Sequence, residues 1–280
     1  MLRSVSPVGI VLSRIHQGGR KMKLNIVFKS VAVLAAVSAT LANAQTVQSS
    51  FAPDNDLWME DSLEAASGIT KEDFNKVIDV ALEAYAPLAK QNKEKIQVNR
   101  KWDDSTVNAN VRRSGGIVEI NMFGGLARRS EVTADGFALV LCHELGHAYA
   151  GAPYIQASSK MSAEGMADFY GNSACMDNVL ALRLGDSTST VTPYIQKKCS
   201  EKAQVGSEDF TTCARELAAG QSLGNLLAVL MKEKLPSFET PDQTVVTKTE
   251  LSYPKTVQCR LDTYHAGALD LARPACWFKN

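Results

Sequence analysis

One short motif restricts this chain more than any other feature of its sequence. The pentapeptide His143-Glu144-Leu145-Gly146-His147 follows an apolar run, residues 136–142, that favours a buried helix. Residues four apart lie one turn apart on the same face of an α-helix, so His143 and His147 can bind one metal ion. Glu144, one step round the helix, can reach a water on that metal. Zinc suits such a site, because catalytic zinc takes nitrogen and oxygen ligands and keeps one position open for water.

A catalytic zinc ion needs a third protein ligand, and the sequence offers few. From residue 45 onward the only further histidine is His265. The metzincin pattern would need a histidine at position 153, where Pro153 stands, so that class is excluded. Downstream, Glu164 and Asp168 lie four residues apart and can share one helix face.

These two carboxylates predict a division of labour. Glu164 can bind the metal, while Asp168 can accept a hydrogen bond from the far nitrogen of a ligand histidine and fix its tautomer and orientation. The reverse assignment, with Asp168 as the ligand, remains open. The remaining alternative is that the histidines bind no metal and only form hydrogen bonds inside the folded protein. The spacing of the two carboxylates argues against it.

The combination H-E-x-x-H and E-x-x-A-D resembles the gluzincin metallopeptidases. It is most similar to the family of CAAX-prenyl endopeptidases and bacterial periplasmic chaperone-proteases, over roughly residues 133–183. The resemblance implies one Zn²⁺ ion, a general base and a carboxylate that supports a ligand histidine. The metal ligands would be His143, His147 and Glu164, the base Glu144, and the supporting carboxylate Asp168.

A third element of that family, a His-Pro pair followed by an arginine, has a partial counterpart at residues 253–260. Tyr253 stands in place of the histidine, and one extra residue precedes Arg260. Because of these departures, no role is assigned to Arg260. The cysteine-bearing C-terminal half suggests a divergent secreted branch.

The reaction implied is hydrolysis of peptide bonds in a peptide or protein substrate. Zinc activates water and polarises the scissile carbonyl, and Glu144 takes the proton and passes it to the leaving amine. Candidate donors to the developing oxyanion are Tyr253, Tyr264 and His265, although the last two can simply pack a C-terminal helix. Gluzincins commonly bind peptide along a free sheet edge. The candidate strand, residues 117–122, can equally be internal.

A zinc site can also be kept for structure or binding alone. The alternative function is therefore a non-hydrolytic periplasmic zinc-binding or chaperone-like protein. Glu144 favours the enzyme, because a structural site needs no base beside an open coordination position.

The first 44 residues are typical of a secretory signal peptide with a short N-terminal extension. Lys21-Met22-Lys23 is a basic start, residues 30–41 are an apolar core, and Ala42-Asn43-Ala44 is a small-x-small cleavage site. Met22 is the expected start of translation. The apolar core is too short for a stable membrane span, so a periplasmic or secreted protein cleaved near Ala44 is predicted.

Charge gives no sign of a nucleic-acid partner. The whole chain has a formal net charge of 0, and removing the six Lys and Arg residues of the leader leaves about −6. No basic patch is present to bind phosphates.

All six cysteines follow the leader, and an even number in an exported chain suggests disulfides. Proximity favours two pairs, Cys199–Cys213 and Cys259–Cys276. Cys142 and Cys175 would remain, either paired or as free buried thiols. No C-x-x-C is present, so a cysteine zinc site is not supported.

The remaining patterns predict an α+β fold that is mainly helical, with a small, partly antiparallel sheet and zincin-type active-site helices. Thr70 is the expected N-cap of a first helix, and extended segments at 96–102, 106–111 and 117–122 predict three or four strands. Helical periodicity dominates afterwards. The motif helix should begin near Thr133 or Asp135 and end near residues 151–153, and a second helix should begin around Ser162 or Ala163 and run towards Arg183. We expect one metallopeptidase-like domain over 45–280, with a loose start, a sheet-containing part at about 70–130 and a helical part at about 131–280.

Overall fold

A buried helix, α3 (Ala134–Tyr149), lies at the centre of the fold, and it carries the histidine motif. Every residue from Asp135 to Ala148 is buried, as expected for a helix that is apolar on nearly all sides. Thr133 is the N-cap, because its side chain accepts a hydrogen bond from the amide of Gly136. The predicted start of this helix is therefore confirmed.

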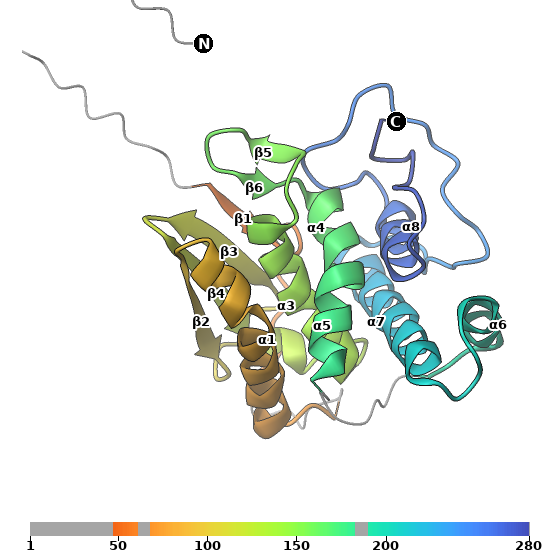
Figure 1. Ribbon diagram of the computed structural model, residues 1–280, viewed down its shortest axis with the longest axis horizontal. Helices are drawn as coiled ribbons and strands as arrows, with labels where there is room; N and C mark the ends of the chain where they lie inside the picture. Colours follow the sequence, from red (N-terminus) through yellow and green to blue (C-terminus); the bar gives the residue numbers. More distant parts are fainter. Residues whose placement is uncertain (1–46, 61–67, 183–189, 280) are drawn as a thin grey trace, which may run out of the picture. The chain divides into compact units, whose positions relative to one another are not determined.

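The computed structural model (Figure 1) describes residues 47–60, 68–182 and 190–279. The predicted signal peptide, the start at Met22 and the cleavage site near Ala44 lie outside the described residues. Contacts gather the chain from Ala44 onward into one compact unit.

The fold class is α+β and mainly helical, as predicted. The described helices are α1 (Lys71–Gln91), α2 (Gly124–Ala127), α3, α4 (Glu164–Tyr170), α5 (Met176–Ala181), α6 (Pro193–Lys202), α7 (Glu208–Met231) and α8 (Val257–Ala268), with a π-helical turn, η1 (Gly171–Cys175), between α4 and α5. The strands are β1 (Gln48–Ser50), β2 (Lys95–Lys101), β3 (Ala109–Ser114), β4 (Ile117–Phe123), β5 (Tyr154–Gln156) and β6 (Met161–Ser162).

The main sheet has the strand order β1-β3-β4-β2 and is mixed. β3 runs antiparallel to both β1 and β4, while β2 runs parallel to β4. Gly115 and Gly116, both with positive φ, form the tight turn between β3 and β4. The small, partly antiparallel sheet is confirmed, although β3 is shifted towards the C-terminus from the predicted 106–111.

One expectation about this sheet is wrong. The strand at 117–122, proposed as the free edge for substrate, is β4, and it is paired on both sides. The two edges are instead β1 and β2, and β1 lies in the segment that we expected to be loose. Gln48-Ser49-Ser50 lacks apolar alternation, so the strand is defined by its backbone pairing with β3 and gives no local signal.

Two helical predictions are confirmed with modifications. The first helix starts after Thr70, which forms a reciprocal capping box with Asp73. The helix predicted to run unbroken from about 163 towards 183 is interrupted at η1. There Asn172 donates to the backbone carbonyls of Glu216 and Tyr264, and side chains that bond elsewhere compete with regular helical bonding.

Three disulfides cross-link the helical part. Cys199–Cys213 joins α6 to α7, and Cys259–Cys276 joins α8 to the C-terminal segment, which confirms both pairs favoured by proximity. Cys142–Cys175 joins α3 to η1, so these two cysteines are also paired. Such cross-links indicate an oxidising, extracytoplasmic compartment. Within the described ranges, every helix is too short or too polar to cross a bilayer.

Candidate metal centre

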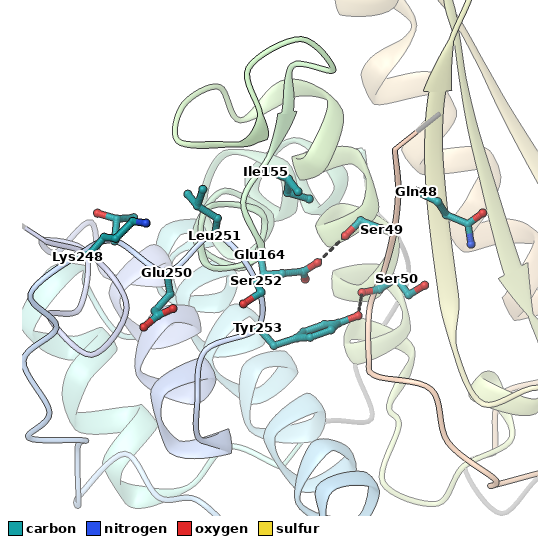
Figure 2. A pocket seen from close by; sticks show the side chains of 11 residues that line it. Gln48, Ser49, Ser50, Ile155, Glu164, Lys248, Glu250, Leu251, Ser252 and Tyr253 are labelled. Atoms are coloured by element: carbon teal, nitrogen blue, oxygen red, sulfur yellow. Dashed lines mark hydrogen bonds between the residues drawn. The ribbon is translucent and has the colours of Figure 1, made fainter. Parts of the chain in front are cut away.

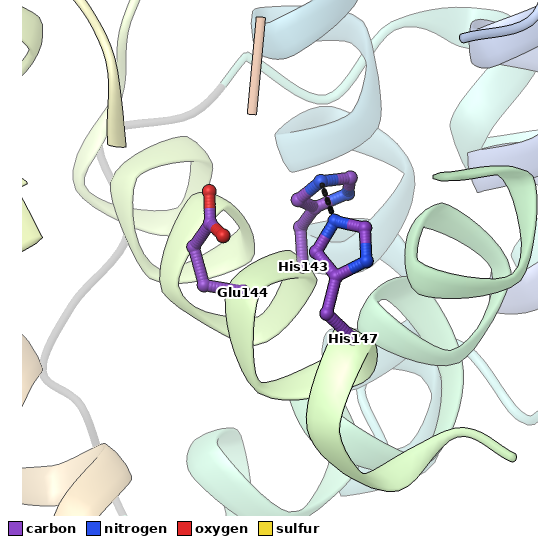
Figure 3. A group of neighbouring side chains, drawn as sticks. All are labelled: His143, Glu144 and His147. Carbon is purple, nitrogen blue, oxygen red and sulfur yellow. Dashed lines mark hydrogen bonds between the residues drawn. The ribbon is translucent and has the colours of Figure 1, made fainter. Parts of the chain in front are cut away.

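The two motif histidines converge as their spacing predicts. The Nε2 atoms of His143 and His147 lie 3.1 Å apart, and both side chains are fully buried (Figure 3). Together with Glu144 they form a group whose ligand atoms lie within 4.8 Å of one another. This group can hold a metal ion.

Glu164 approaches the same point from the first turn of α4. Its Oε2 lies 3.4 Å from His143 Nε2 and 3.6 Å from His147 Nε2, and it has no hydrogen-bond partner. Burial alone would raise the pKa of Glu164, but His147 and His143 lower it below its usual range. The carboxylate is therefore ionised and presents one free oxygen to the two nitrogens.

The other ring nitrogens are held by the protein. His143 Nδ1 bonds Asp168 Oδ1 at 2.8 Å, and His147 Nδ1 donates to the carbonyl of Ser162 at 2.7 Å. A hydrogen bond at Nδ1 fixes the ring and leaves Nε2 as the metal-facing nitrogen. Asp168 thus lies behind His143, whereas Glu164 faces the Nε2 atoms.

α4 can approach α3 closely because of one glycine in the motif. A Cβ on Gly146 would lie only 2.9 Å from the Cα and the carbonyl oxygen of Ala167. A larger residue would push apart the two helices that carry the group.

Arg260 and Tyr264, one helical turn apart on α8, complete the surroundings of Asp168. Arg260 binds both carboxylate oxygens, at 2.8 and 2.7 Å, and Tyr264 donates to Oδ1 at 2.8 Å. Although burial alone would raise the pKa of Asp168, Arg260 and His143 lower it to about 2. No role was assigned to Arg260 from sequence. The signal for it was the partial family element at 253–260.

Charge balance also favours a bound cation. Among the described residues around the histidines, three buried carboxylates (Glu144, Glu164 and Asp168) face one permanent cation, Arg260. Although burial alone would lower the pKa of His143, Asp168 and Glu164 raise it to about 9. Surroundings that favour a proton on His143 equally favour a divalent cation between the Nε2 atoms.

Glu144 differs from the other carboxylates because neither of its oxygens has a hydrogen-bond partner. In Figure 3 its side chain rises from the same helix beside the two imidazoles, and a carboxylate oxygen lies within 4.8 Å of a ligand nitrogen of each histidine. Burial, which is only partly offset by His143 and His147, raises the pKa of Glu144 to about 7. An unpartnered carboxylate of this kind is suited to accept and return a proton.

The three proposed oxyanion donors lie in different places. Tyr264 donates to Asp168. His265, about 100° further round α8, bonds Tyr194 and packs at a tilt against Phe238. The structure therefore brings neither of them to the metal-facing side. Tyr253 lies beside Glu164 at the wall of a cavity.

That cavity, about 490 Å³, lies between β1 and the segment 248–253 (Figure 2). Glu164 is the only proposed metal ligand that lines it. The Tyr253 hydroxyl donates to the carbonyl of Ser50 at 2.7 Å, across the cavity from one wall to the other. Ile155 and Leu251 add apolar surface.

A second group of ligand atoms, Asp242 with Cys259 and Cys276, is unsuited to metal because its cysteines form a disulfide. Searches of protein-family models, of curated proteins and of solved structures found no significant match to this chain. The resemblance to gluzincins therefore rests on the motif residues alone.

Proposed function

We propose that this protein is a zinc-dependent metalloendopeptidase of the gluzincin type, similar to the CAAX-prenyl endopeptidases and bacterial periplasmic chaperone-proteases. The observation that carries this proposal is the convergence of His143 Nε2, His147 Nε2 and Glu164 Oε2, with the unpartnered carboxylate of Glu144 beside them.

Zinc fits the donor set better than other common metals. Two imidazoles and one carboxylate make the three-ligand set of many catalytic zinc sites, whereas calcium and magnesium prefer oxygen alone. A bound zinc ion would activate water and polarise the scissile carbonyl.

The side chains divide the remaining work. Glu144 takes the proton of the attacking water on one carboxylate oxygen and delivers it to the leaving amine. Asp168, held by Arg260, keeps His143 oriented. Tyr253 is the oxyanion donor that we retain, because it lines the cavity beside Glu164. Its hydroxyl donates to the carbonyl of Ser50, so it would exchange that acceptor for the oxyanion when substrate binds along β1.

An extended peptide would lie in the cavity along the unpaired edge of β1. An edge strand offers free backbone groups for pairing, and Ile155 and Leu251 offer apolar contact to a substrate side chain. Export through the predicted signal peptide, to the periplasm or outside the cell, agrees with the three disulfides.

A specific observation favours the second candidate, a non-hydrolytic zinc-binding or chaperone-like protein. His143, Glu144 and His147 are fully buried, and only Glu164 reaches the cavity, so substrate needs the cavity wall to open.

Zinc analysis joined to cleavage of an unbiased peptide library separates the two functions. We expect one zinc per wild-type chain with cleavage, and one zinc without cleavage for Glu144→Gln. A wild type that holds zinc but cleaves nothing supports the binding protein, and a wild type without zinc contradicts both functions.

A further inference from the structure

Strand β1 contributes one side chain to the metal group. Ser49 is buried, and its hydroxyl donates to Oε1 of Glu164 at 2.5 Å, across 115 residues of sequence (Figure 2). Its neighbours in the strand, Gln48 and Ser50, are exposed or partly exposed. Ser49 is therefore the residue of β1 that faces the proposed ligand.

This contact distinguishes the two oxygens of Glu164. Oε1 is occupied by Ser49, while Oε2 is left without a partner and faces both Nε2 atoms. A glutamate on the first turn of a helix has several side-chain torsions to fix, and ordering it costs conformational entropy. A hydrogen bond to the far oxygen offsets this cost before any metal arrives.

We propose that Ser49 is a positioning residue that selects Glu164 Oε2 as a single-oxygen ligand. The inference rests on the proposed metal site. With Oε1 engaged, the carboxylate cannot readily turn to bind through both oxygens, and a coordination position stays free for water.

The backbone of α4, the helix that carries Glu164, is restrained by a contact that does not involve Ser49. The effect of Ser49 on the side chain can therefore be separated from the position of the helix. Trp277 packs against Gly165, where a Cβ would come within 2.3 Å of the indole ring, so it holds the start of α4 in place. That apolar contact limits the position of the helix but does not choose between the two oxygens of Glu164.

β1 is also held without the Ser49 hydroxyl. Its backbone pairs with β3, Tyr253 donates to the carbonyl of Ser50, and Arg260 donates to the carbonyl of Phe51. Removing one hydroxyl should therefore leave the strand in place and release only the carboxylate.

The test is the zinc affinity of the full exported chain, measured by competition with a chromophoric chelator, for wild type and four variants. Ser49→Ala and Ser49→Val should bind zinc about 10–100-fold more weakly, as for other groups that orient metal ligands. Ser49→Thr, which keeps the hydroxyl and has the shape of valine, should restore the affinity. Ser222→Ala removes a buried hydroxyl that bonds Glu131 and Thr133, and should leave it unchanged.

A second readout is the visible spectrum of the Co²⁺-substituted protein. Four-coordinate Co²⁺ absorbs more strongly than five-coordinate Co²⁺, so a glutamate freed to bind through both oxygens should weaken the bands in Ser49→Ala and Ser49→Val only. Equal affinity and equal spectra in wild type and both hydroxyl-free variants would overturn the inference.

Failure of the inference can be told apart from failure of the proposed function. Wild type that binds zinc but cleaves no peptide contradicts the peptidase and leaves the role of Ser49 standing. Loss of cleavage in Ser49→Ala with unchanged metal affinity and spectrum contradicts the role of Ser49 and leaves the peptidase standing.

Discussion

Arg260 and Asp168 form a fully buried bidentate ion pair, with Nε–Oδ2 and Nη2–Oδ1 distances of 2.8 and 2.7 Å. The pair joins α8 to the helix that carries Glu164. Because Asp168 also accepts from His143, the guanidinium of Arg260 stands two contacts away from the proposed metal.

Replacing Arg260 should therefore be costly. Arg260→Met leaves a buried carboxylate without its cation, and we expect the free energy of unfolding to fall by about 3–5 kcal/mol. Arg260→Lys should recover only part of this lost stability, since lysine cannot form the bidentate pair. Urea denaturation measures both. As a control, Lys71→Met, in an exposed ion pair with Asp103, should cost less than about 1 kcal/mol.

Zinc content should separate Glu164 from Asp168. Glu164→Ala removes the carboxylate that faces both Nε2 atoms and should abolish stoichiometric zinc. Asp168→Ala removes a supporting group and should weaken binding about 10–100-fold while zinc still binds at saturation. Metal analysis after equilibrium dialysis gives the comparison, and near-full occupancy in Glu164→Ala would reject our assignment.

Kinetics should separate the three proposed donors. Tyr253→Phe should lower kcat of the proposed peptidase about 10²–10³-fold with little change in KM, as expected for loss of an oxyanion donor. His265→Ala should leave kcat unchanged, because His265 bonds Tyr194 instead. If His265→Ala loses as much activity as Tyr253→Phe, the assignment of Tyr253 fails.

Stability should depend on pH through Glu216 on α7. Burial, and then the nearby Asp177, raise the pKa of Glu216 well above its usual value. The folded state keeps a proton on Glu216 that the unfolded state loses. The contribution of this group to stability is therefore full below about pH 4.3 and falls as pH rises towards the folded pKa. Glu216→Gln, which mimics the protonated acid, should raise Tm at pH 8 but not at pH 4. Equal changes at both pH values would contradict this.

Two of the three disulfides should differ in their effect on metal binding. Cys142 directly precedes His143, so replacing Cys142 and Cys175 together by serine should cost about 2–4 kcal/mol and also weaken zinc binding. Cys199 and Cys213 close a shorter loop that joins α6 to α7. Their double replacement should lower Tm and spare zinc affinity, which calorimetry and chelator competition can check.

The features that the sequence predicted correctly depend on residues close together in the chain. Thr70, Thr133 and the spacing of His143 with His147 each act within one or two helical turns, and their structures followed from propensity and periodicity. Glu164 and Asp168 were found because they also lie one turn apart.

The missed features depend on distant partners. Ser49 lies in a strand without apolar alternation, and its role appears only when β1 pairs with β3. Arg260 was left without a role because the carboxylate that it binds, Asp168, is 92 residues away in the sequence. The break at η1 depends in the same way on carbonyls of α7 and α8 that accept from Asn172.

These long separations carry a consequence for how the chain folds. The contacts that complete the metal group span 115 residues from Ser49 to Glu164 and 209 from Phe51 to Arg260. Contacts of such high order form late, since loop-closure entropy must be overcome first. During synthesis the motif helix emerges before α8, so a nascent chain carries both histidines without the arginine that fixes Asp168. A metal ion bound by this group would therefore reach its final geometry only at the last stage of folding.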